Sequence, residues 1–276
     1  MNIQFACTYW GQEGTAASTF LQKILNAGYR GAEVFLGADI DFKNAIIQEV
    51  EKARKNEHDF VFIPLQLLTP EQESIDNFIS RMENELLELS SYQPTFINSH
   101  TGKDYFSFDD NCRIIEASLN MAAKTGVRIL HETHRGRFSF HAATLISYLE
   151  KFPELELVAD FSHFCTVSES MLQDQEEIIS KIIPHVSHIH ARVGFEQGPQ
   201  VNDPFAPEWE NHLLIFEHWW QQIIQHKSEE GFQNITITPE FGPPPYMPVM
   251  PYTQKPLSNQ WQVNVDMMNY IKSKIS

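Results

Sequence analysis

The chain has 276 residues, 42% of them hydrophobic, and it carries a formal net charge of −16 with a pI near 5.1. This length and composition suit one large α/β core rather than several small domains. A chain this acidic is a poor electrostatic match for a polyanion, so we expect no nucleic-acid partner. Small molecules and other partners met in solution remain open.

The cysteines and the N-terminus bear on the cellular location. Cys7, Cys112 and Cys165 show no CxxC spacing, and an odd, scattered set indicates free thiols in a reducing compartment. The opening stretch lacks the basic and apolar regions of a signal peptide. No run approaches the ~20 apolar residues of a membrane span. We therefore expect a cytoplasmic protein with no membrane partner.

Short apolar runs rich in Val, Ile and Phe recur along the whole chain and alternate with helix-like stretches. Their length and composition are typical of strands buried on both faces. They predict eight strands, over residues 3–9, 32–36, 60–67, 95–100, 127–133, 155–161, 186–192 and 235–241.

The stretches between these runs show the apolar periodicity of amphipathic helices. Residues 19–31 form one such stretch, with Gly28 and Gly31 as the expected stop, and 111–126 and 169–184 are expected to end at Gly126 and Pro184. Alternating strands and helices favour a parallel sheet, and eight repeats favour a closed barrel. The fold class predicted is α/β, a (β/α)8 TIM barrel forming a single domain over residues 1–276. A doubly wound open sheet is the alternative, but no Gly-rich phosphate loop follows the first strand.

Chemically active side chains stand at the ends of the last four predicted strands. They lie in LHETHRG (130–136), VADFSH (158–163), HIHARVG (188–194) and TITPEFG (236–242). A parallel barrel brings the carboxyl ends of its strands to one mouth, where active sites lie. Three carboxylates and one imidazole there suit one divalent metal ion, with Mn²⁺, Mg²⁺, Co²⁺ and Zn²⁺ all open. The predicted metal ligands are Glu132, Asp160, His190 and Glu240.

Several other residues near the predicted mouth have less specific roles. His188 shares a strand face with His190, and we expect it to be a hydrogen-bonded core residue. Glu33, at the end of the second strand, is expected to be an inward-facing hydrogen-bond anchor. Trp10 and Phe35 are expected to pack in the core, with an apolar wall against a ligand as the alternative.

Two further features follow predicted strands. His134 and Arg135, just after Glu132, are interpreted as a supporting or salt-bridged pair rather than as catalytic residues. The segments 196–209 and 242–256 are rich in proline and aromatic residues. Long loops after barrel strands usually build or cover the site. We therefore expect both segments to form walls of the site or subunit contacts.

Taken in this order, the segments resemble the xylose isomerase-like barrels, a family of sugar isomerases and epimerases that also includes endonuclease IV. The resemblance runs from GYRGAEVF (28–35) to Glu240. In the resembled epimerases, a Glu, an Asp, a His and a Glu at strands 5 to 8 bind one divalent cation, and the two glutamates transfer the proton. The resemblance thus implies that Glu132 and Glu240 are catalytic as well as metal ligands.

The same resemblance implies contacts to a substrate. The spacing of Asp160 and His163 matches a family motif whose histidine faces the substrate, and HARVG is similar to the segment whose arginine, here Arg192, touches it. His100 and Lys103, in NSHTGKD after the fourth strand, are further substrate-binding candidates, with an ordinary loop hydrogen bond as the alternative for each.

The implied activity is that of a metal-dependent sugar isomerase or epimerase, which moves a proton through an enediolate on a ketose or related sugar. An inosose-type dehydratase using the same site and a non-catalytic sugar-binding barrel are the alternatives. An endonuclease would need three metal ions, and the segment after strand 3, IPLQLLTP, has no histidine. Few Lys or Arg residues near the predicted site favour an unphosphorylated sugar as the small-molecule partner. A homodimer is open, since family members often pair.

Overall fold

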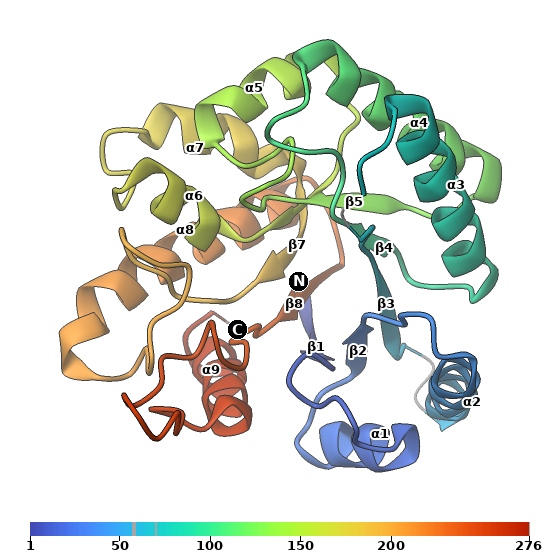
Figure 1. Ribbon diagram of the computed structural model, residues 1–276. Coiled ribbons are helices and arrows are strands. Elements are labelled where there is room, and N and C mark those ends of the chain that lie inside the picture. The colour runs from blue at the N-terminus through green and yellow to red at the C-terminus, as the bar shows by residue number, and fades with distance from the viewer. Residues whose placement is uncertain (57–58, 70, 276) are drawn as a thin grey trace.

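Eight parallel strands close into one barrel in the computed structural model, which describes residues 1–56, 59–69 and 71–275 (Figure 1). The strands follow one another around the barrel in chain order, and β8 pairs with β1 through Phe5 and Ile237. The predicted (β/α)8 barrel is thereby confirmed. The strands are β1 (Asn2–Thr8), β2 (Gly31–Val34), β3 (Val61–Gln66), β4 (Ile97–Ser99), β5 (Ile129–Glu132), β6 (Leu157–Ala159), β7 (Val186–His190) and β8 (Asn234–Thr238).

The α-helices form an outer ring around the strands (Figure 1). They are α1 (Ala17–Asn26), α2 (Ile40–Asn56), α3 (Ile75–Ser91), α4 (Phe108–Thr125), α5 (Ala142–Lys151), α6 (Phe161–Ser168), α7 (Glu176–Ile182), α8 (Glu210–Glu229) and α9 (Gln260–Lys274), with short 3₁₀ turns η1 (Ile183–His185) and η2 (Pro207–Trp209). Among the described residues, no helix combines the length and the apolarity needed to cross a membrane.

Local sequence signals explain several helix ends. Ser107 caps the start of α4 by accepting a hydrogen bond from the backbone N–H of Asp110 at 3.1 Å. Gly126 ends that helix in the left-handed conformation, at φ 70°. The predicted end of this helix is therefore confirmed.

The prediction of one helix over residues 169–184 was wrong. Helix α6 ends at Ser168, and Glu169 takes a left-handed conformation with φ 48°. Helical structure resumes only at α7, since Met171 and Leu172 turn into the core between the two helices. Pro184 does not end α7, because it lies inside the 3₁₀ turn η1 that follows.

Gly31 also has another role than the helix stop predicted for it. It is the first residue of β2, and a Cβ atom there would lie 2.8 Å from Val61 Cβ and 3.1 Å from Ala6 Cβ. A side chain at this position would crowd the interior of the barrel, so glycine permits the close approach of the strands. Gly28, with φ 93°, provides the turn after α1.

Alternate residues of each strand face opposite sides of the barrel wall. A small cluster fills the interior: Ala6, Val61, Ile63, Phe96, Leu130 and Val158. The intervening residues, such as Phe62 and Ile237, belong to the larger core between the strands and the helices. Because every strand runs in the same direction, all carboxyl ends meet at one mouth, and polar side chains gather there.

Candidate metal centre and active-site cavity

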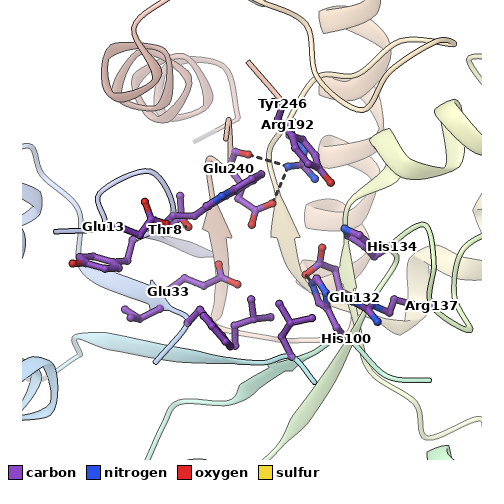
Figure 2. Close-up of a pocket in the computed structure, with 16 residues that line it drawn as sticks. Thr8, Glu13, Glu33, His100, Glu132, His134, Arg137, Arg192, Glu240 and Tyr246 are labelled. Atoms are coloured by element: carbon purple, nitrogen blue, oxygen red, sulfur yellow. Dashed lines mark hydrogen bonds and ion pairs between the residues drawn. The ribbon is translucent and has the colours of Figure 1, made fainter. Parts of the chain in front are cut away.

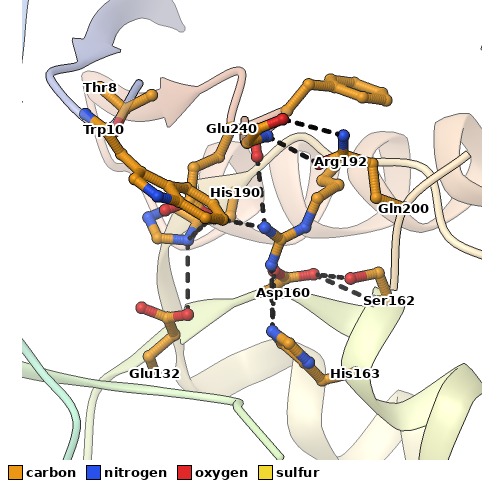
Figure 3. A network of polar contacts seen from close by, with 12 residues as sticks. Thr8, Trp10, Glu132, Asp160, Ser162, His163, His190, Arg192, Gln200 and Glu240 are labelled. Atoms are coloured by element: carbon orange, nitrogen blue, oxygen red, sulfur yellow. Dashed lines mark hydrogen bonds and ion pairs between the residues drawn. The ribbon is translucent and has the colours of Figure 1, made fainter. Parts of the chain in front are cut away.

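The four predicted metal ligands lie together at the carboxyl mouth of the barrel (Figure 3). Glu132 ends β5, Asp160 directly follows β6, His190 ends β7, and Glu240 stands two residues beyond β8. One oxygen or nitrogen atom of each lies within 4.8 Å of the corresponding atoms of the others. The barrel therefore unites side chains that are far apart in the sequence.

The two ring nitrogens of His190 face different groups: Nδ1 faces the cluster, and Nε2 faces Glu33. Its Nε2 atom donates a hydrogen bond to Glu33 Oε1 at 3.0 Å, so the lone pair of the neutral ring is on Nδ1. Nδ1 lies 3.1 Å from Glu240 Oε2 and 3.7 Å from Glu132 Oε1, and it has no hydrogen-bond partner among the described residues. Burial lowers the pKa of His190, but Glu240, Glu33 and Glu132 raise it well above its usual value. The carboxylates around His190 therefore favour a positive charge next to its Nδ1 atom.

The donor atoms fit a single divalent cation. Ligand atoms about 2.0–2.2 Å from one ion lie roughly 3–4 Å from each other, and the two separations at His190 Nδ1 fall in this range. Carboxylate and imidazole donors are accepted by Mn²⁺, Mg²⁺, Co²⁺ and Zn²⁺ alike. The hydrogen bond from His190 to Glu33 is of the kind that orients a metal-binding histidine.

Glu33 and His188 lie next to the cluster and have the roles predicted for them, Glu33 as an inward-facing hydrogen-bond anchor and His188 as a hydrogen-bonded core residue. Glu33 accepts a hydrogen bond from Asn98 Nδ2 at 2.9 Å, and His188 pairs through Nδ1 with Thr236 Oγ1 at 2.6 Å. Burial by itself would raise the pKa of Glu33, but His190 and His188 hold it below its usual value. Glu33 is therefore ionised and accepts hydrogen bonds only.

Hydrogen bonds hold one oxygen of Glu132. Its Oε2 atom accepts from Asn98 Nδ2 at 2.8 Å and from His100 Nε2 at 2.9 Å. Burial would raise the pKa of Glu132, but His100 and His190 keep it well below the usual value. Glu132 is therefore ionised, as a proton acceptor must be.

Arg192 lies among the carboxylates of the cluster. Its guanidinium contacts Asp160 Oδ2 and lies 3.4 Å from Glu240 Oε2, and its side chain is only 1% exposed (Figure 3). Burial raises the pKa of Asp160 to about 6, with Arg192 opposing and Glu240 reinforcing the shift. Arg192 thus offsets part of the negative charge that three carboxylates create here.

The cluster opens into a cavity of about 450 Å³ at the mouth (Figure 2). Glu132, Glu240, Arg192 and His100 line this cavity, so two of the four predicted substrate contacts lie on its wall. His163 is fully buried instead, and its Nε2 atom lies 3.0 Å from an Arg192 nitrogen. His163 therefore contacts Arg192 and does not line the cavity.

Lys103 also lies off the lining of this cavity. It is 8% exposed and follows His100 in the loop after β4. His134 lines the cavity, and its ring lies between those of His100 and His163, tilted to both, with ring centres 4.6 and 3.9 Å away. Arg135 is exposed, and its carbonyl oxygen lies 2.5 Å from His134 Nδ1; no carboxylate of the described residues forms a salt bridge with either side chain, so the interpretation as a salt-bridged pair was wrong.

Aromatic residues form the apolar part of the wall. Trp10 and Phe35 both line the cavity, and Phe35 is 44% exposed, so the expectation that they pack in the core was wrong. The alternative, an apolar wall, fits their positions. Tyr246 completes this wall, with its ring centre 4.9 Å from that of Trp10 and 5.0 Å from Arg192 Cζ.

The two proline-rich segments have different roles. Tyr246 belongs to segment 242–256, which therefore lines the site. Gln200, in segment 196–209, donates to the carbonyl oxygen of Gly242 at 3.1 Å and accepts from its N–H at 2.6 Å. The segment after β7 thus anchors the start of the segment after β8.

Among the cavity-wall residues that were not predicted from the sequence are Arg137 and Tyr246. Arg137 follows β5 in the loop RGRFSF, where the sequence drew attention only to its neighbours His134 and Arg135. The one signal available was its place in a loop at the carboxyl end of a barrel strand.

Fold and site together define a (β/α)8 barrel with a candidate divalent-metal centre at its carboxyl mouth. The chain belongs to the Xylose isomerase-like TIM barrel family, whose sequence profile matches residues 21–268. No curated protein shows a sequence match to this chain.

Solved structures similar to this chain have several different activities. They include 3-keto-D-glucoside 4-epimerase YcjR from E. coli (TM-score 0.59, 13% identity, covering 99% of this chain and 100% of the other). The probable 3-DHS dehydratase AsbF from Bacillus anthracis has a TM-score of 0.62 at 13% identity, with 98% and 99% covered. Endonuclease IV from Thermus thermophilus has a TM-score of 0.62 at 10% identity, with 99% and 100% covered. At these identities the likeness shows the shared fold alone.

Proposed function

We propose that this protein is a divalent-metal-dependent sugar isomerase or epimerase. The observation that carries the proposal is the cluster of Glu132, Asp160, His190 and Glu240 beside the cavity, with Nδ1 of His190 facing two carboxylates. When bound there, the cation supplies Lewis-acid stabilisation of the negative charge that develops on the sugar oxygens.

Glu132 and Glu240 are the proton-transfer pair. One takes the proton from the carbon between a carbonyl and a hydroxyl group. The other returns a proton to the neighbouring carbon, while the hydroxyl proton passes to the former carbonyl oxygen, giving an isomer; or it returns the proton to the opposite face of the same carbon, giving an epimer. Both carboxylates line the cavity, and Glu132 is kept ionised by His100 and His190.

The remaining wall residues orient the sugar and limit the access of water. Arg192 lies against the aromatic rings of Trp10 and Tyr246 and offers its guanidinium at the cavity wall. The positive charge of Arg192 stabilises the negative charge that develops on the enediolate. The aromatic rings provide an apolar surface that suits the carbon face of a sugar.

Dehydration of an inosose is the second candidate, because it begins with the same proton abstraction and then expels a β-hydroxyl group. Likeness in fold to the probable dehydratase AsbF is compatible with this alternative. A nuclease is disfavoured by the net charge of −16, which repels a phosphate backbone.

Metal content of the purified protein is the first test. We expect about one Mn, Co, Mg or Zn per chain, the number a single four-ligand site holds. Glu240→Gln is expected to weaken that binding, and Glu13→Gln is the matched control, since Glu13 lines the cavity outside the cluster. Three metal ions per chain would favour a nuclease, and no metal even after reconstitution would contradict the proposal.

Exchange of substrate protons with solvent tests the chemistry. Candidate ketoses and inososes are incubated with the protein in D₂O and followed by NMR. Deuterium at the carbon next to the carbonyl, absent with Glu240→Gln, supports proton transfer. Isomers or epimers among the products support the proposed activity, whereas loss of water indicates the dehydratase.

A further inference from the structure

Two cations stand together beside the cavity, in the loops after β4 and β5. Arg137 lines the cavity wall, and the charge of Arg137 acts on Lys103 in the neighbouring loop. The two loops are joined by a hydrogen bond from Phe138 N to Thr101 O at 3.4 Å. Figure 2 shows Arg137 beside His100 and Glu132, across the cavity from Thr8 and Glu13.

The backbone around both cations is held in place. Asn111 Nδ2 donates to the carbonyl oxygen of Lys103 at 2.9 Å, and Asn111 Oδ1 accepts from its N–H at 3.2 Å. On the other loop, Arg137 N donates to the carbonyl of His134 at 3.1 Å. The backbone at both positions is therefore fixed by the fold, and Lys103 as a whole is only 8% exposed.

Neither cation has a carboxylate partner. Within residues 1–56, 59–69 and 71–275, no carboxylate oxygen lies within 4.0 Å of the charged group of Arg137 or Lys103. Arg137 Nε is buried and lacks any hydrogen-bond partner among these residues. Its terminal NH2 group lies 3.3 Å from His100 Nδ1, a neutral acceptor in the tautomer whose Nε2 donates to Glu132. Glu132 and Asp104 act on Arg137 only at longer range.

This arrangement is unusual for so acidic a chain. The protein has 36 Asp and Glu against 20 Lys and Arg, and the other arginine on the cavity wall, Arg192, contacts both Asp160 and Glu240. Burial lowers the pKa of Arg137, and burial together with the Arg137 charge lowers that of Lys103. A buried cation without a partner costs free energy, which a bound anion would offset.

We propose that Arg137, assisted by Lys103, binds an anionic group of the substrate, so that the substrate is a sugar acid or a sugar phosphate rather than a neutral ketose. This inference rests on the proposed function. A guanidinium with a free Nε donor binds carboxylate or phosphate oxygens through charge-assisted hydrogen bonds. Arg137 contacts His100, and His100 contacts Glu132, so an anion held at Arg137 leaves the carbon chain beside the catalytic carboxylates.

Calorimetric titration with three probes tests this inference and separates the two kinds of anion. The probes are 5-keto-D-gluconate, D-fructose 6-phosphate and D-fructose, titrated into the purified protein with and without added Mg²⁺. We expect at least one anionic probe to bind at least about tenfold more tightly than D-fructose, because a buried charge pair supplies that much selectivity. The probe preferred identifies carboxylate or phosphate as the group recognised.

Variants assign the preference to Arg137. Arg137→Gln is expected to remove the preference, and Arg137→Lys to retain part of it. Arg113→Gln is the control, since Arg113 is half-exposed on α4 and paired with Asp76. Thermal melting of each variant establishes that it is folded. If neither anion binds more tightly than D-fructose, or if Arg137→Gln keeps the preference, the inference is wrong.

The outcome is independent of catalysis. Binding is measured without turnover, so anion binding at Arg137 can be established even if no proton exchange is found, in which case the proposed activity fails by itself. Conversely, proton exchange on neutral ketoses with no anion preference supports the activity and overturns the inference.

Discussion

His190 and Glu240 face each other at the mouth of the barrel, with 3.1 Å between Nδ1 of the imidazole and Oε2 of the carboxylate. On the opposite side of the same ring, Nε2 donates to Glu33 at 3.0 Å. The imidazole is thus held by one carboxylate so that its other nitrogen points at the cluster. This relationship makes the centre sensitive to changes in Glu33, which lies outside the four-ligand set.

Glu33→Gln is expected to lower the affinity for a divalent metal by about 10- to 100-fold, the usual cost of removing a carboxylate that orients a ligand histidine. The substitution keeps the shape of the side chain and removes its charge. Metal affinity is measured by competition with a chromophoric chelator. Glu13→Gln, in the same cavity but outside the cluster, should leave the affinity unchanged, and an equal loss in both variants would contradict the assigned role of Glu33.

Metal binding is expected to weaken as the pH falls through about 6, where Asp160 takes up a proton, since its pKa is raised to about 6 by burial. A metal ion binds the carboxylate form, so a proton competes with it below this pH. His190 acts in the same direction, because its raised pKa adds a proton that the metal must displace.

Mn²⁺ titrations followed by electron paramagnetic resonance between pH 5 and pH 8 measure this dependence. Asp160→Asn should bind less tightly and lose the step near pH 6. An affinity that stays constant over the whole range would show that no protonation of the cluster is linked to binding.

Gly242→Ala is expected to destabilise the fold by about 1–3 kcal/mol, a typical cost of overpacking. A Cβ atom at this position would overlap the six-membered ring of Trp10. Unfolding in urea gives the free-energy change. In a Trp10→Ala background the same substitution should cost much less, because the overlapping ring is absent. An equal cost in both backgrounds would place the effect elsewhere.

The three cysteines are expected to be unreactive in the folded protein. Cys7, Cys112 and Cys165 are all buried and free, and burial raises the pKa of Cys7 to about 12. The thiolate is the reactive form, so both access and ionisation oppose modification. Ellman's reagent at pH 8 should detect no thiol in the native protein and three after denaturation. A thiol that reacts at once in the native state would contradict this burial.

Much of the fold could be predicted because the strands are local features. Runs such as 60–67 and 186–192 are apolar and β-branched enough to indicate buried strands, and each contains an observed strand. Local sequence patterns predicted the secondary structure less well where tertiary packing determines the backbone conformation. Residues 169–184 have helical periodicity, yet the core draws in Met171 and Leu172 and divides the segment.

The candidate site was predictable to the extent that its residues end strands. Glu132, Asp160, His190 and Glu240 could be grouped before the structure was known, because closure of a parallel barrel leaves one place for the ends of its strands. Arg137 and Tyr246 lie in loops, where position depends on contacts made after the barrel forms. The sequence drew attention to segment 242–256 as a wall of the site but not to Tyr246 within it, and it drew attention to the neighbours of Arg137 but not to Arg137 itself.

The sequence by itself determined the barrel and the set of side chains at its mouth, since the order of strands and helices and the residues at strand ends are properties of the linear chain. Tertiary structure decided which of these side chains line the cavity, which nitrogen of His190 faces the carboxylates, and that His163 supports Arg192 from a buried position. The reason is physical: hydrogen-bond direction, burial and charge pairing depend on distances across the barrel, which exist only once all eight strands have closed.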